Sequence, residues 1–115
     1  MALKKAKDRP RPPAHLRPAT KRWFAHVCEV YDLEEHHARL LTLAGESWDR
    51  CEQARIALAK DGLTYLDRFG APRSRPEIAV ERDSRTAFSR LIRELDLDCG
   101  TPASSRPPSL RSNRG

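Results

Sequence analysis

Hydrophobic residues recur at intervals of three and four in three separate stretches of the chain, which is the spacing that predicts amphipathic helices. The first stretch begins at Pro18, which suits a first helical position because its φ is fixed and it lacks an N–H, and it predicts a helix over residues 18–31. The second follows Asp32 and Glu35, which have the spacing of a capping box, and continues to Gly62, a residue that favours a left-handed helix end.

A third helical pattern begins near Pro76, between Ser74 and Glu77, and ends near Leu95. The segment before it, residues 63–74, breaks the helical period. It contains residues with strand propensity, then a turn-like sequence and a proline that prevents a long second strand. We therefore predict an all-α bundle of three helices, with a long central helix and a small β-hairpin or structured loop between the second and third.

The second predicted helix is longer than the first, so one partner helix cannot cover its whole apolar stripe. We expect part of this stripe to meet another helix or another subunit, which would make the protein a ring homo-oligomer. The residues predicted to be largely buried, some of them between subunits, are Leu41, Ala44, Trp48, Cys51 and Leu58.

The two ends of the chain have a different composition. Residues 1–17 mix Lys and Arg with proline and contain few large apolar groups, and residues 99–115 are rich in proline, serine and arginine. Such segments bury too little surface to offset the entropy of ordering. We predict a disordered basic arm over residues 1–17, a helical oligomerisation core over residues 18–98 and a disordered tail over residues 99–115.

Charge is distributed unevenly along the 115 residues, whose formal net charge is +6. Residues 1–22 hold eight basic side chains against one aspartate, a balance of +7, whereas residues 23–98 carry −4. Basic arms on an acidic core are typical of proteins that bind a polyanion, usually nucleic acid, although basic tails can also serve solubility alone. The candidate DNA-binding residues are Lys4, Lys5, Lys7, Arg9, Arg11, Arg17, Lys21 and Arg22.

Catalytic and metal-binding patterns are missing from the sequence. His26 and Cys28 would point in opposite directions on a helix, and His36 and His37 diverge by about 100°. Three cysteines without a CxxC pair predict reduced thiols, and no glycine pattern would cradle a phosphate. We expect no cofactor, no metal site, no enzymatic activity, and a cytosolic protein without a signal peptide or membrane span.

The aromatic residues allow two interpretations. Trp23 and Trp48 fall within apolar stripes at helical spacing, which favours packing over base stacking. Tyr65 and Phe69 lie in the excursion between the second and third helices, where an intrachain core demands aromatics less. For these two, an interaction role and simple anchoring of the loop both stay open.

Four segments together resemble the small subunit of tailed-phage terminases, P27 type. They are PPAHLRPATKRWF (12–24), YDLEEHHARLLTLAGESWDRCEQAR (31–55), DGLTYLDRFGAPRSRP (61–76) and ERDSRTAFSRLIRELDLD (81–98). The most specific parts are the W-D-R stretch at 48–50, the glycine-containing turn at 62–72 and the final helix at 81–98. The sequence departs from the family pattern at Arg17, where a serine would be expected as the cap of the first helix.

The resemblance implies a DNA-packaging factor without catalytic activity of its own, working in the cytoplasm of a bacterial host. Members of this family form rings, bind double-stranded viral DNA and present it to the large terminase subunit, whose ATPase and nuclease carry out packaging. A helix-turn-helix transcription regulator is the main alternative, although the excursion before the third helix does not look like its tight turn. A helical adaptor that binds only protein is a second alternative.

Overall fold

The computed structural model describes residues 9–97 of the chain. Its elements are α1 (Pro18–Val30), α2 (Glu35–Asp61), β1 (Thr64–Leu66), β2 (Pro72–Ser74) and α3 (Pro76–Leu95). The two strands pair antiparallel, with Tyr65 opposite Arg73. The predicted mostly helical fold with a small hairpin between the second and third helices is therefore confirmed.

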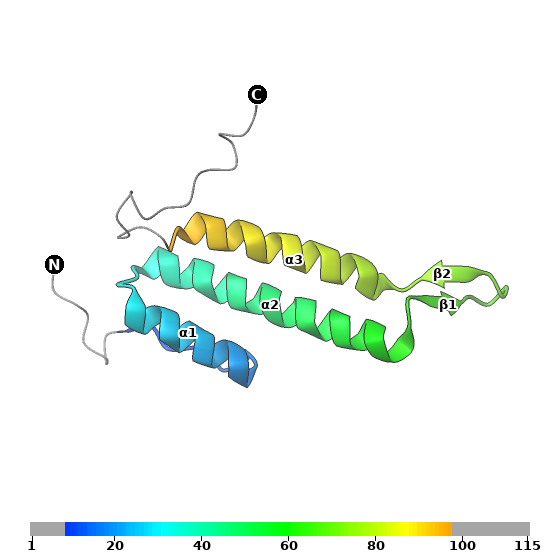
Figure 1. Cartoon of the computed structure of the whole chain (residues 1–115), viewed down its shortest axis with the longest axis horizontal. Coiled ribbons are helices and arrows are strands. Elements are labelled where there is room, and N and C mark those ends of the chain that lie inside the picture. The colour runs from blue at the N-terminus through cyan, green and yellow to red at the C-terminus, as the bar shows by residue number, and fades with distance from the viewer. Residues whose placement is uncertain (1–8, 98–115) are drawn as a thin grey trace, which may run out of the picture.

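The helices lie side by side, and α2 packs against both of the others (Figure 1). α1 runs antiparallel to the first half of α2, whereas α3 runs back along nearly its full length. The β1–β2 hairpin continues outward from the far end of the α2–α3 pair. The molecule thus has a three-helix part around the first half of α2 and a two-helix part that ends in the hairpin.

Proline and glycine set most of the helix ends, as the sequence predicts. Pro18 and Pro76 each stand at the first position of a helix, where the missing N–H costs no hydrogen bond. α2 ends before Gly62, which has φ +86° and donates its N–H to the Leu58 carbonyl at 2.8 Å. A side chain at this φ would be strained, so glycine suits this position.

The start of α2 differs from the prediction. The N-cap is Glu34 rather than Asp32, and the Glu34 backbone N–H donates to His37 Nδ1 at 3.3 Å. Leu33 explains the difference, because its side chain is buried in the core. The backbone is therefore extended at Glu34, which lets the Leu33 side chain reach the core, and the helix begins at Glu35.

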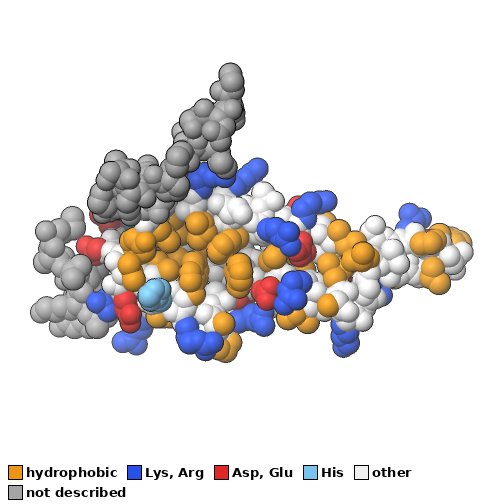
Figure 2. Space-filling model, in the orientation of Figure 1, with side chains coloured by type: hydrophobic (Ala, Val, Ile, Leu, Met, Phe, Trp, Pro, Cys, Tyr) orange, Lys and Arg blue, Asp and Glu red, His pale blue; other side chains and the backbone are white. Residues whose placement is uncertain are grey.

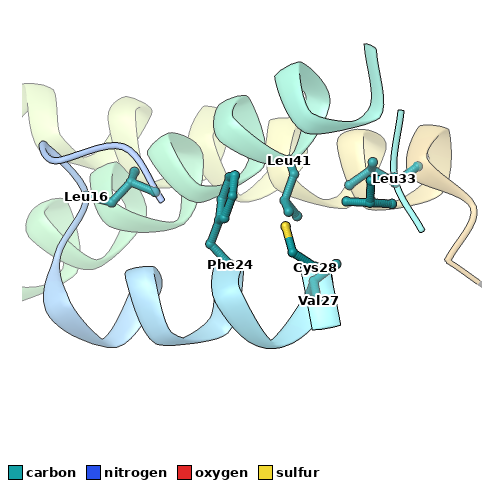
Figure 3. Close-up of a cluster of buried hydrophobic side chains, with 7 residues drawn as sticks. Leu16, Phe24, Val27, Cys28, Leu33 and Leu41 are labelled. Atoms are coloured by element: carbon teal, nitrogen blue, oxygen red, sulfur yellow. The ribbon is translucent and has the colours of Figure 1, made fainter. Parts of the chain in front are cut away.

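The main core lies where α1 meets the first half of α2 (Figure 3). Phe24, Val27 and Cys28 of α1 point toward α2, and Phe24 and Leu41 have almost no exposed surface. Leu95 of α3 also belongs to this cluster. The burial of these side chains occurs entirely in the three-helix part of the molecule.

The segment immediately before α1 packs against α2, although its composition predicts disorder. Leu16 is buried and packs over Gly45 of α2, where an added Cβ would lie 3.2 Å from Leu16 Cδ1. The His15 ring contacts the Glu46 carboxylate at 2.7 Å. The prediction of a disordered arm is therefore wrong for the end of the segment 1–17. Residues 1–8 and the predicted tail, residues 99–115, lie outside the described residues.

Candidate interaction surfaces

Asp49 of α2 holds the start of α1 in place. Its carboxylate accepts a hydrogen bond from the Arg17 backbone N–H at 2.8 Å and another from the Thr20 hydroxyl at 2.5 Å. Helix starts need such acceptors because their first N–H groups have no partner within the helix. Arg17 has no side-chain cap of its own, so a residue from another helix supplies the acceptor.

A charged residue in a helix is ordinarily solvated, but the exposed fraction of Asp49 is only 7%. Leu41, Gly45 and Asp49 follow one another at intervals of four and therefore lie on one face of α2. That face is covered by α1 and Leu16. The interval of four residues between Leu41, Gly45 and Asp49 was the feature of the sequence that could have indicated the burial of Asp49.

The candidate DNA-binding residues fall into two groups. Lys4, Lys5 and Lys7 lie outside the described residues, whereas the other five lie in the segment before α1 or in its first turns: Arg9, Arg11, Arg17, Lys21 and Arg22. None of these five side chains forms a salt bridge with another residue of the range 9–97. Arg17 still interacts electrostatically with the Glu52 carboxylate, whereas the other four cations have no ion-pair partner in that range.

α3 carries the alternative cationic surface. Arg82 pairs with Asp83 and Arg85 pairs with Glu81, which reduces the charge that these two arginines offer to a ligand. Arg90 and Arg93 are exposed and form no salt bridge among the described residues. This pair offers less unpaired charge than the five cations at and before the start of α1.

An aromatic residue from each helix meets its neighbours on one face of the molecule. The Phe88 ring of α3 lies 6.0 Å from the Trp23 ring and 5.1 Å from the Trp48 ring, measured between centroids. Together with Ala19 and Thr20, these three side chains line a partly open cavity of about 200 Å³. We call this cavity the aromatic groove. Figure 2 shows an apolar patch that extends over the helices on the face in view.

A second cavity, of about 300 Å³, shares Trp48 and Phe88 with the aromatic groove as lining residues. Its rim holds two ion pairs, one of them between Arg55 and Glu52 at 3.0 Å. The hydrogen bond from Arg55 lowers the pKa of Glu52. This rim is therefore charged but locally neutral, and the apolar surface is concentrated at Trp48 and Phe88.

The residues predicted to lie at an oligomer interface have different positions in the structure. Leu41 and Ala44 have no exposed surface within the single chain, so they offer nothing to a second copy. Cys51 and Leu58 are half-buried. Trp48 is 47% exposed within the single chain, so any further burial of this side chain would have to come from a second copy, and its place at an oligomer interface stays a prediction.

The tip of the hairpin, defined as residues 66–71, presents large apolar side chains to solvent. Leu66 is 70% exposed and Phe69 is 79% exposed. Asp67 fixes this turn, since its carboxylate accepts the backbone N–H groups of Phe69 and Ala71, both at 2.9 Å. Phe69 is thus held outward by a hydrogen-bonded turn.

We expect the tip to lose order in acid. The N–H of Ala71, the Arg73 guanidinium and the N–H of Phe69 lower the pKa of Asp67. A lowered folded-state pKa means that this stabilisation is complete above the unfolded pKa of about 3.9 and is lost as the pH falls through the folded value. The amide NMR signals of Phe69 and Ala71 should therefore shift and lose protection against hydrogen exchange as the pH falls below about 4, and Asp67→Ala should show the same loss of protection at neutral pH. Unchanged amides in Asp67→Ala would contradict this role.

Metal and nucleophile chemistry has little support in the described part of the chain. Residues 9–97 contain no group of three or more His, Cys, Asp and Glu side chains that could hold a metal ion. The His36 and His37 rings contact each other at a centroid distance of 4.1 Å, and His37 takes part in the start of α2. Cys28 is buried, Cys51 is half-buried, and Cys99 lies outside the described residues.

No family model, curated protein or solved structure matches the chain in the comparisons with known proteins. Within residues 9–97, the helices are too short or too polar to cross a bilayer.

Proposed function

We propose that this protein is a small terminase subunit that binds viral DNA and recruits or regulates the large ATPase–nuclease subunit during genome packaging. In this proposal it acts as a ring homo-oligomer in the cytoplasm of the bacterial host and catalyses no reaction itself. The sequence resemblance supplies the identity of the partners. The observation that carries the proposal is the separation of charge, +7 over residues 1–22 and −4 over residues 23–98.

The cationic residues that the structure describes support a role in DNA binding. Those of the segment 9–22 form no salt bridge within the described range, so their charge is available to phosphates. Phosphate contacts from Lys and Arg provide sequence-independent affinity for duplex DNA, and the number of such contacts grows when chains assemble. The helical body, being acidic, would be repelled unless the basic segment made the first contact.

The family-like motifs occupy distinct structural positions. The W-D-R stretch contains Trp48 of the aromatic groove and Asp49 beneath α1. The turn from Gly62 to Pro72 builds the hairpin, and the final motif lies largely on α3 with Phe88 in the groove. The residues of these motifs therefore hold the helices and the hairpin in place or line a surface groove. Such roles fit a subunit that functions by assembling with other proteins.

A helix-turn-helix regulator is less compatible with the observed geometry. α2 and α3 are separated by the hairpin and lie antiparallel. The short connection between α1 and α2 also joins antiparallel neighbours, whereas the helices of that motif cross at about 90–120°. Moreover, α2 starts with Glu34 and Glu35, and these carboxylates would meet phosphates or acceptor-rich base edges.

The proposal is tested by titrating the full chain against linear duplex DNA at several salt concentrations, with native mass measured on the same sample. We expect an assembly larger than a dimer that binds duplex DNA with strong salt dependence and changes the ATPase rate of a large terminase subunit. Absence of DNA binding at low salt would favour the protein-only adaptor. A dimer with strong sequence preference would favour the transcription regulator.

A further inference from the structure

The tip of the hairpin carries an exposed aromatic ring and unpaired positive charge at the same place. We propose that the tip is a second DNA contact, which enters the minor groove of a duplex and wedges the Phe69 ring between two base pairs. The inference rests on the proposed function in requiring that the protein binds duplex DNA. It adds a contact that bends the DNA, at a site far from the basic segment before α1.

Positive charge is concentrated in two regions of residues 9–97. The segment 9–22 has five basic side chains and no acidic one, a balance of +5, and the hairpin, residues 63–75, has three arginines against one aspartate, a balance of +2. The remaining helical residues, 23–62 and 76–97, have eight basic side chains against thirteen acidic ones, a balance of −5. The hairpin is therefore a positive site of its own, separated from the first by helices that are acidic overall.

Two of the three hairpin arginines have charge to offer to a ligand. Asp67 pairs with Arg73 at 3.0 Å, so this aspartate neutralises only that arginine. Arg68 and Arg75 form no ion pair within residues 9–97. An unpaired guanidinium binds phosphate oxygens well, and an exposed aromatic ring can stack on a base. The two together fit nucleic acid.

The tip is shaped to present a wedge. Phe69 is 79% exposed, and Asp67 fixes the turn that holds it outward by accepting the N–H groups of Phe69 and Ala71. The Arg68 guanidinium lies 4.9 Å from the centre of the Phe69 ring, so a cation accompanies the ring. Figure 2 shows apolar and basic side chains together at this end of the molecule. Proteins insert phenylalanine between base steps from the minor groove, whose negative potential attracts arginine.

The distance between the two positive sites matches the repeat of a duplex. The start of α1 lies beside Asp49, about 18 Å before the end of α2 at Asp61 for a rise of 1.5 Å per residue. The hairpin then continues outward (Figure 1), and its strand adds about 13 Å. The two sites are thus about 30 Å apart along the molecule, close to one duplex turn of about 34 Å. Minor grooves recur at this spacing, whereas a lipid surface or an acidic protein offers no such repeat.

Two variants separate the wedge from the charge. Phe69→Ala removes the ring and keeps all three arginines, and Arg68→Gln removes one unpaired cation and keeps the ring. The matched control for the ring is Ile56→Ala, which removes an apolar side chain of α2 that is 46% exposed. The matched control for the charge is Arg90→Gln, at an exposed and unpaired arginine of α3 among the described residues. Circular dichroism should confirm that each variant is helical.

The probe is a linear duplex of about 30 base pairs with TA steps, which unstack easily, and with a fluorophore at each end. Energy transfer between the ends reports bending, and we expect the wild type and both controls to bend the duplex. Phe69→Ala should bind about tenfold more weakly, leave the duplex straight and keep the slope of log K against log salt. Arg68→Gln should make that slope less steep by about 0.9 per engaged chain.

The outcomes distinguish this inference from the proposed function. Bending and affinity that are equal in Phe69→Ala and the wild type, or a duplex that stays straight with the wild type, would overturn the inference alone. A Phe69→Ala variant that loses only the binding of a large terminase subunit, or only the binding of phosphatidylserine vesicles, would assign the tip to protein or lipid and also overturn it. A wild type that does not bind duplex DNA would contradict both proposals. Bending that requires Phe69, without any effect on the ATPase of a large terminase subunit, would support the inference and contradict the proposed function.

Discussion

Asp49→Ala is expected to lower the free energy of unfolding by about 3 kcal/mol, because it removes two hydrogen bonds to a charged acceptor at a buried site. The Arg17 N–H and the Thr20 hydroxyl would both lose their partner, and Thr20 is itself buried away from water. The loss is large for a small domain, whose total stability is typically about 5–15 kcal/mol. Urea unfolding followed by circular dichroism measures the change.

Two variants make this prediction specific. Thr20→Val, which removes only one of the two donors and keeps the shape of the side chain, should cost about 1 to 2 kcal/mol. Glu52→Ala, one turn away on the exposed side of α2, should change stability by about 0.5 kcal/mol or less. Equal unfolding midpoints for Asp49→Ala and the wild type would show that α1 is held by apolar contacts alone.

Replacing Lys4, Lys5 and Lys7 with alanine should weaken the binding of duplex DNA without changing the helical fold. These residues precede Leu16, which among residues 9–97 is the first in the buried core. If all three contact phosphates, the slope of log K against log salt should become less steep by about 2.7 per chain. The affinity should therefore fall most at low salt, where counterion release contributes most.

The matched control for this charge removal is Arg90→Ala with Arg93→Ala on α3, which deletes exposed unpaired cations from the helical body. We expect this pair to leave the salt slope nearly unchanged. If the α3 pair flattens the slope and the lysine variant does not, the DNA site lies on the helical body. Titration of fluorescent linear duplex at several salt concentrations provides both slopes.

The helix ends were predictable because they depend on residues with strong local preferences. Pro18, Gly62 and Pro76 act through their own backbone geometry, and tertiary contacts did not override them. The hairpin was likewise predictable from strand propensity followed by a turn. The start of α2 was not, because burial of Leu33 shifted the cap from Asp32 to Glu34.

The candidate surfaces were harder to predict than the helices. Apolar spacing cannot tell whether a residue such as Trp48 faces its own chain or solvent, since both depend on how far α1 extends along α2. Asp49 was missed because a charged residue in a helix is usually solvated, and its partners lie in α1 and the segment before it. Leu16 was missed because a single leucine among prolines and arginines gives no periodic pattern.

Because α1 covers only half of α2, the chain should not unfold as a single cooperative unit. The buried cluster surrounds α1, while the far halves of α2 and α3 are held by each other alone. Regions with few buried contacts open by local unfolding at lower free energy than the core. Local unfolding should therefore start at the hairpin and stop near the aromatic groove. The hairpin and the adjoining halves of α2 and α3 can then bend or unfold while α1 stays packed on α2.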